Sequence, residues 1–62
     1  MTTANVNRGL EVLEIIRKTH DTTKLSADLF GELCRATMFY LKGTWTNEQV
    51  AKLVIEEIWI AA

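Results

Sequence analysis

Apolar residues recur at intervals of three and four along most of this 62-residue chain, which is the spacing of amphipathic helices. The pattern breaks at the polar stretch from Thr19 to Lys24 and again around Gly43. The spacing predicts three helices, at about 5–19, 27–42 and 47–60. We therefore expect an all-α fold in which residues 1–62 form a single small helical domain.

The first predicted helix carries its apolar residues in one arc. Gly9 lies within that arc, where the absence of a side chain would let a neighbouring helix approach closely. The arc consists of Val6, Leu10, Val12, Leu13 and Ile16. We expect this whole arc to face the core.

Local signals mark the ends of the other two helices. Ser26 is a good N-cap for the second helix, and Gly43 is a natural C-terminal stop. The sequence from Thr46 to Gln49 fits a capping box at the start of the third helix. The apolar face of the second helix is Leu29, Phe30, Leu33, Cys34, Ala36, Tyr40 and Leu41, and that of the third is Val50, Leu53, Val54, Ile58 and Ala61.

A strand is the rival interpretation for the segment from Val54 to Ile60, which is rich in β-branched residues. The adjacent glutamates Glu56 and Glu57 break the alternation that a strand would need. Together with the capping box upstream, they favour a helix.

Each predicted helix also places one large apolar residue on its polar face, namely Ile15, Phe39 and Trp59. The apolar arc of the third helix spans roughly 220° at helical spacing, wider than contact with two neighbouring helices needs. Exposed apolar patches mark interaction sites, and aromatic residues are enriched in them. The predicted protein interface consists of Ile15, Phe39, Ile55, Glu57, Trp59 and Ile60.

Glu57 has two interpretations, because it falls within the apolar arc of the third helix. A slight rotation of the helix end would leave its carboxylate in solvent. Alternatively, it would form an ion pair with an arginine across an interface, contributing specificity more than affinity.

The small size of the chain favours association. For 62 residues, burial of apolar surface contributes on the order of 90 kcal/mol and ordering costs about as much. A single cysteine and a single histidine exclude an internal disulfide framework and a four-ligand Cys/His zinc site. We therefore predict that the three helices form a homodimeric helical bundle.

Charge and residue inventory narrow the function further. Seven Lys and Arg against eight Asp and Glu give a net charge of −1, which argues against nucleic acid as the main partner. His20 lies at a helix end and Cys34 on an apolar face, so we expect neither to be catalytic. We predict no enzyme activity, no cofactor and no metal. The apolar runs are too short to cross a membrane and the N-terminus lacks a signal-peptide pattern, so a cytoplasmic location is expected.

Two short segments show resemblances to DNA-binding families. The stretch from Lys42 to Glu48 resembles the opening of a Myb/SANT repeat, in which a tryptophan precedes an N-capped acidic helix; the later tryptophans and basic helix of that repeat have no counterpart here. The stretch from Thr46 to Leu53 is similar to the first helix of a helix-turn-helix unit, but no glycine turn follows it. These resemblances imply a DNA-binding fold for only a small part of the chain.

The sequence thus predicts a small non-enzymatic protein–protein interaction module. It would act as an inhibitor, anti-activator or adaptor by occluding the surface of a target protein, a profile typical of phage and mobile-element accessory proteins. The expected partners are a second copy of the chain and a protein target. One alternative is a dimeric DNA-binding transcriptional regulator that uses Arg8, Arg17, Lys18 or Arg35. The other alternative is a self-assembling scaffold piece.

Overall fold

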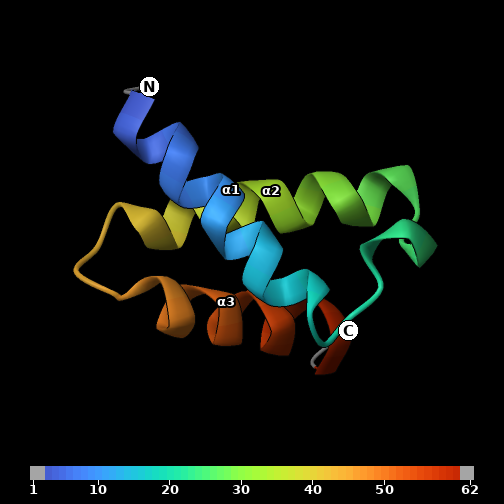
Figure 1. The fold of residues 1–62 in the computed structure, drawn as a ribbon. Helices are drawn as coiled ribbons and strands as arrows, with labels where there is room; N and C mark the ends of the chain where they lie inside the picture. The colour runs from blue at the N-terminus through green and yellow to red at the C-terminus, as the bar shows by residue number, and fades with distance from the viewer. Residues whose placement is uncertain (1–2, 61–62) are drawn as a thin grey trace.

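Three helices form the fold in the computed structural model, which describes residues 3–60 (Figure 1). The elements are α1 (Thr3–Arg17), the short 3-10 helix η1 (Thr22–Lys24), α2 (Ala27–Leu41), α3 (Asn47–Ile55) and the π-helical turn η2 (Glu56–Ile60), which continues α3. The described residues contain no strand. The all-α class and the three predicted helices are therefore confirmed.

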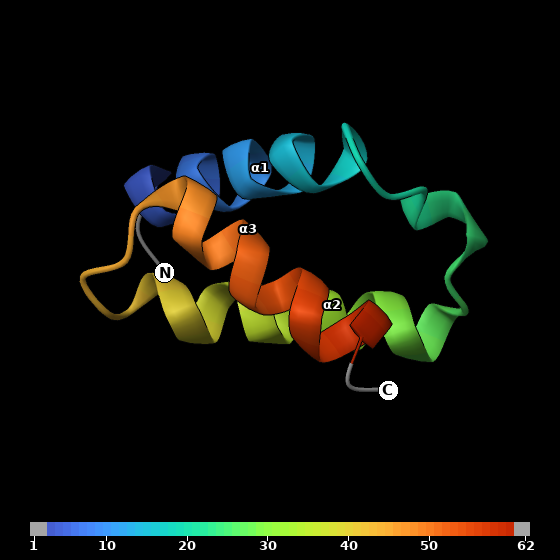
Figure 2. The same ribbon diagram turned by 90° about the horizontal axis from the view of Figure 1, so that it is seen from below.

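The helices α2 and α3 run antiparallel, and α1 crosses over both of them (Figures 1 and 2). Each of the three helices contributes to one core, and the molecule measures 28 × 19 × 19 Å. The buried apolar residues are Val12, Ile16, Leu33, Leu41, Val50, Ala51, Val54 and Ile58. Because α1 lies across two helices, its flanks border two separate grooves.

The predicted N-caps are confirmed. The Ser26 hydroxyl accepts a hydrogen bond from the backbone N–H of Leu29 at 3.2 Å. The Thr46 hydroxyl accepts from the N–H of Gln49 at 3.2 Å, and the Gln49 side chain accepts from the N–H of Thr46 at 2.9 Å. This capping box satisfies two amide groups that the first turn of α3 would otherwise leave without partners.

The predicted stop near Gly43 is confirmed, although this glycine does not adopt the left-handed conformation common after a helix end. The helix α2 ends at Leu41, and no glycine in the described residues has a positive φ. The N–H of Gly43 instead donates to the carbonyl of Tyr40 at 3.1 Å. A Cβ at Gly43 would lie only 3.2 Å from Cδ1 of Trp45, so this glycine gives the indole ring room to lie against the loop.

The core-facing line of α1 is narrower than the sequence indicated. Val12 and Ile16 are fully buried and Gly9 is also buried, whereas Val6 is 44% and Leu10 57% exposed. The expectation that Val6 and Leu10 belong to the core is therefore wrong. They lie to one side of the buried line, where α1 borders α2 and no third helix covers them.

The π-helical turn η2 corrects the predicted surface of the third helix. Its wider turns rotate each residue through less than the 100° of an α-helix. Beyond Ile55, the smaller rotation per residue moves Glu57 out of the apolar arc and brings Trp59 into it. Glu57 is exposed, and Trp59 is half-buried against the core. The prediction that Trp59 lies on the polar face is wrong, and within this chain Glu57 follows the solvent interpretation. Ala61 lies outside the described residues.

Buried polar groups in the described part of the chain all have partners. The Thr37 hydroxyl, at the centre of the core face of α2, donates to the carbonyl of Leu33 at 2.8 Å. Among residues 3–60, no helix has the length and apolar character needed to span a bilayer.

Candidate functional site

Three of the six predicted interface residues come together in a groove between α1 and α3. Ile15 and Ile55 are half-buried beside the core, and Ile60 is 72% exposed. This α1/α3 groove has a volume of about 340 Å³, and Thr19, Glu48, Ala51, Lys52 and Glu56 complete its lining. Its centre is aliphatic, and charged side chains of both signs form its rim.

Two further predicted residues, Phe39 and Glu57, lie together on another face. Phe39 is 68% exposed, and its ring contacts the Tyr40 ring edge-on, with centroids 5.4 Å apart. The hollow here, between α2 and η2, has a volume of about 380 Å³. We call it the Phe39 face, and it consists of Glu32, Arg35, Ala36, Phe39, Tyr40 and Glu57.

Trp59 is separate from both of these sites. Its ring lies 4.7 Å from the ring of His20, centroid to centroid, with an interplanar angle of 46°. The contact joins the turn after α1 to η2, so Trp59 packs the C-terminal turn against that segment. This contact could not be predicted from the sequence pattern, because 39 positions separate the two residues.

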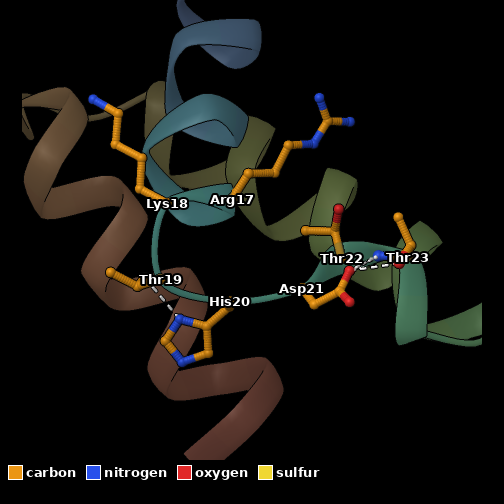
Figure 3. A pocket seen from close by; sticks show the side chains of 7 residues that line it. All are labelled: Arg17, Lys18, Thr19, His20, Asp21, Thr22 and Thr23. Carbon is orange, nitrogen blue, oxygen red and sulfur yellow. Dashed lines mark hydrogen bonds between the residues drawn. The ribbon is translucent and has the colours of Figure 1, made fainter.

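The loop after α1 borders an open hollow of about 470 Å³, lined by residues 17–23 (Figure 3). The hydroxyl of Thr19 is 2.8 Å from Nδ1 of His20, and a carboxylate oxygen of Asp21 accepts from the N–H of Thr23 at 3.0 Å. Figure 3 shows Arg17 and Lys18 directed away from the His20 ring. The loop's polar groups thus bond to one another and do not converge on a common point where a ligand would sit.

Sequence reasoning missed an apolar groove between α1 and α2. This α1/α2 groove has a volume of about 180 Å³ and is lined by Val6, Gly9, Leu10, Leu13, Cys34, Thr37 and Met38. Cys34 is half-buried here and packs against the core, in agreement with its predicted position on the apolar face of α2. The available signal was the position of Val6, Leu10 and Leu13, which lie together at one edge of the α1 arc.

A polar cluster fixes the start of α3 against α1. Nε of Arg8 donates to Oδ1 of Asn47 at 3.0 Å, and Nη2 of Arg8 donates to the carbonyl of Trp45, also at 3.0 Å. Nδ2 of Asn47 donates to Oε2 of Glu11 at 2.7 Å. The backbone of Trp45 therefore helps to hold the loop against α1, while the residue as a whole is 46% exposed.

The arginines considered for DNA binding all have partners within the chain. Arg8 belongs to the cluster with Asn47, Arg17 pairs with Glu14 at 3.3 Å, and Arg35 pairs with Glu32 at 2.6 Å. Two of these three cations therefore lie beside a carboxylate on their own helix, which reduces the positive potential that phosphate groups would meet.

Chemistry-bearing residues are scattered across the described part of the chain. Within residues 3–60, no group of three or more His, Cys, Asp and Glu side chains is arranged to hold a metal ion. Comparisons with protein-family models, with curated proteins and with solved structures found no match to this chain.

Proposed function

We propose that this protein is a small non-enzymatic interaction module, which self-associates as a homodimer and occludes the surface of a target protein. The observation that carries the proposal is the α1/α3 groove, where Ile15, Ile55 and Ile60 lie together although they come from two distant segments. In this role the protein would serve as an inhibitor, anti-activator or adaptor. The expected cytoplasmic location stays a prediction.

The composition of the α1/α3 groove supports a protein target. Protein interfaces place apolar anchors at the centre and polar side chains at the rim, where they exclude water. Here the aliphatic centre is bordered by Glu48, Lys52 and Glu56. An apolar side chain of the target would displace water from the isoleucines, while its charged neighbours would meet the rim.

Exposure of large apolar side chains supports self-association. Leu10 is 57%, Phe39 68% and Ile60 72% exposed in the single chain, and each lies in or beside one of the grooves described above. Association removes such surface from water, and each buried apolar Å² contributes about 25 cal/mol.

Sedimentation of the pure protein tests self-association. A homodimer has twice the 7.1 kDa mass of the chain, and its proportion rises with protein concentration by mass action. A species of one-chain mass at every concentration up to the millimolar range would contradict the homodimer.

Affinity capture from the source organism tests the target-binding role. The wild-type protein is compared with Ile60→Ser, which places a hydroxyl in the α1/α3 groove, and with Leu29→Ser. Leu29 is a matched control because it is 39% exposed and does not line that groove. We expect one protein to be captured by wild type and by the Leu29 variant but not by the Ile60 variant. Identical capture by all three would exclude the groove as the binding site.

A further inference from the structure

We propose that the homodimer forms through the Phe39 face, with Arg35 of each copy pairing with Glu57 of the other across a two-fold axis. This inference rests on the proposed self-association and specifies which surface carries it. The partner is a second copy of this chain, and the contact consists of an aromatic centre between two reciprocal ion pairs.

The first step concerns the aromatic centre. Phe39 is 68% exposed on the outer surface of α2, and its edge-on contact with the Tyr40 ring restrains the orientation of its side chain. A restrained aromatic ring loses little conformational entropy on binding, which is the property of an interface anchor. Two such rings would meet at the axis of a symmetric dimer.

The second step concerns the order of charges around that ring. Each residue of an α-helix advances by about 100°, so Ala36 and Tyr40 lie to one side of Phe39, and Arg35 and Lys42 lie to the other. Glu57 lines the same hollow as Ala36 and Tyr40. Glu32, which pairs with Arg35, also lines this hollow and lies about 20° from Phe39 toward Ala36. The face therefore runs from cations, through the phenyl ring, to carboxylates.

The third step is symmetry. In a two-fold contact, residue i of one copy meets residue j of the other, and j meets i. A face ordered as cation, ring and anion complements itself about a two-fold axis that passes through the ring at right angles to that order, because each cation then meets an anion. A different protein would need the same order by coincidence, whereas a second copy supplies it necessarily.

Exposure of the charged groups fits this arrangement. The side chain of Arg35 is 73% exposed although it contacts Glu32, and Glu57 is exposed. Arg35 carries five N–H donors, so it can keep its bond to Glu32 while it donates to Glu57 of a second copy. Exclusion of water at the contact would strengthen a pair that is weak when it is exposed.

Charge reversal tests the inference. Arg35→Glu creates two like-charged contacts per dimer, and so does Glu57→Arg. We expect each variant to raise the dimer dissociation constant by at least about tenfold, since like charges placed opposite one another are strongly unfavourable. The measurement is sedimentation equilibrium of each variant at matched ionic strength.

Mixing the two variants tests directly whether Arg35 and Glu57 pair across the dimer contact. A heterodimer of Arg35→Glu and Glu57→Arg chains has opposite charges at both contacts, so the mixture should regain association. The double variant, with both reversals in one chain, should dimerise like wild type. Arg17→Glu is the matched control, because it disrupts an equivalent pair with Glu14 on α1 and should leave dimerisation unchanged.

The outcomes separate the two proposals. If wild type dimerises and both single variants have dissociation constants within twofold of the wild-type value, the Phe39 face is overturned and self-association still stands. Single variants that dissociate without recovery on mixing would also overturn the reciprocal pairs. A wild-type chain that stays monomeric would overturn self-association together with this contact. Circular dichroism of each variant shows whether the helices are retained.

Discussion

The ring of His20 lies 4.7 Å from the ring of Trp59, with an interplanar angle of 46° between them. This contact joins the end of α1 to the π-helical turn η2, which is the last element of the chain that the structure describes. The N–H of His20 also donates to the carbonyl of Ile16 at 2.9 Å, so the imidazole is held at the end of α1. The pair therefore fixes the C-terminal turn against the first helix.

We expect Trp59→Ala to lower the free energy of unfolding by about 2–3 kcal/mol, somewhat less than for a fully buried tryptophan. His20→Ala should cost about 1 kcal/mol. In a double-mutant cycle, the two side chains should couple by about 0.5–1.5 kcal/mol, the range for stacked rings. Urea denaturation at one fixed protein concentration measures these values, since association would shift them. Additive single effects would show that the rings do not interact.

The η2 turn explains why this contact could not be predicted from the sequence. Helical periodicity correctly predicted a helix as far as Ile60, but it assumed 3.6 residues per turn throughout. The π-helical geometry shifts Trp59 toward the core and Glu57 away from it. The choice between α and π geometry depends on how the side chains of this turn pack against the rest of the fold, which a pattern of residue spacing does not encode.

The same limit applies to α1. The apolar pattern correctly predicted a helix and the burial of Val12 and Ile16. It could not show that α1 crosses α2 and α3 together, an arrangement that leaves Leu10 at the edge of the contact. The caps at Ser26 and Thr46 were predictable because capping depends on residues three positions apart, not on the tertiary arrangement.

Clustering of the candidate site was only partly predictable. Helical spacing indicated Ile15, Ile55 and Ile60 separately as interface residues. The packing of α1 against α3 brings them into one groove. The charge order of the Phe39 face needs Glu57 of η2 beside Tyr40 of α2. Because the tertiary fold brings these two residues together, the spacing of residues along the sequence could not predict their proximity.

The cluster around Asn47 should contribute more to stability than the exposed ion pairs. Asn47→Ala removes bonds to Arg8 and Glu11, which join α1 to α3. Because part of this cluster is buried, we expect a loss of about 1–2 kcal/mol. Arg17→Ala, which removes a solvent-exposed pair, should change stability by less than about 0.5 kcal/mol. Equal effects in urea denaturation would contradict a special role for Asn47.

Substitutions in the capping box at the start of α3 should lower the stability of the protein by graded amounts. Thr46→Ala removes the acceptor for the N–H of Gln49 and should cost about 1 kcal/mol. Thr46→Ser keeps a hydroxyl and should cost much less. Gln49→Ala removes only the reciprocal bond to the N–H of Thr46, so it should fall between them. Thermal denaturation followed by circular dichroism ranks the three variants, and a Ser variant as unstable as the Ala variant would argue against capping.

Replacement by alanine should stabilise the protein at Gly9 and Gly31. A Cβ at Gly31 would meet no atom within 4 Å, and one at Gly9 would lie 3.6 Å from Sδ of Met38, an ordinary contact. Both residues are inside α-helices, where alanine is favoured over glycine by about 1 kcal/mol. We therefore expect Gly9→Ala and Gly31→Ala each to raise the free energy of unfolding by about 0.5–1 kcal/mol.

Gly43→Ala should instead be destabilising. Its Cβ would lie 3.2 Å from Cδ1 and 3.3 Å from Nε1 of the Trp45 ring, so the indole would have to move. Because the loop gains no helix propensity to offset this movement, the net effect should be a loss of about 0.5–1 kcal/mol. The fluorescence of Trp45 should change as well, and placing Gly43→Ala in a Trp59→Phe background isolates that signal. An unchanged spectrum together with unchanged stability would show that the ring does not lie against Gly43 in solution.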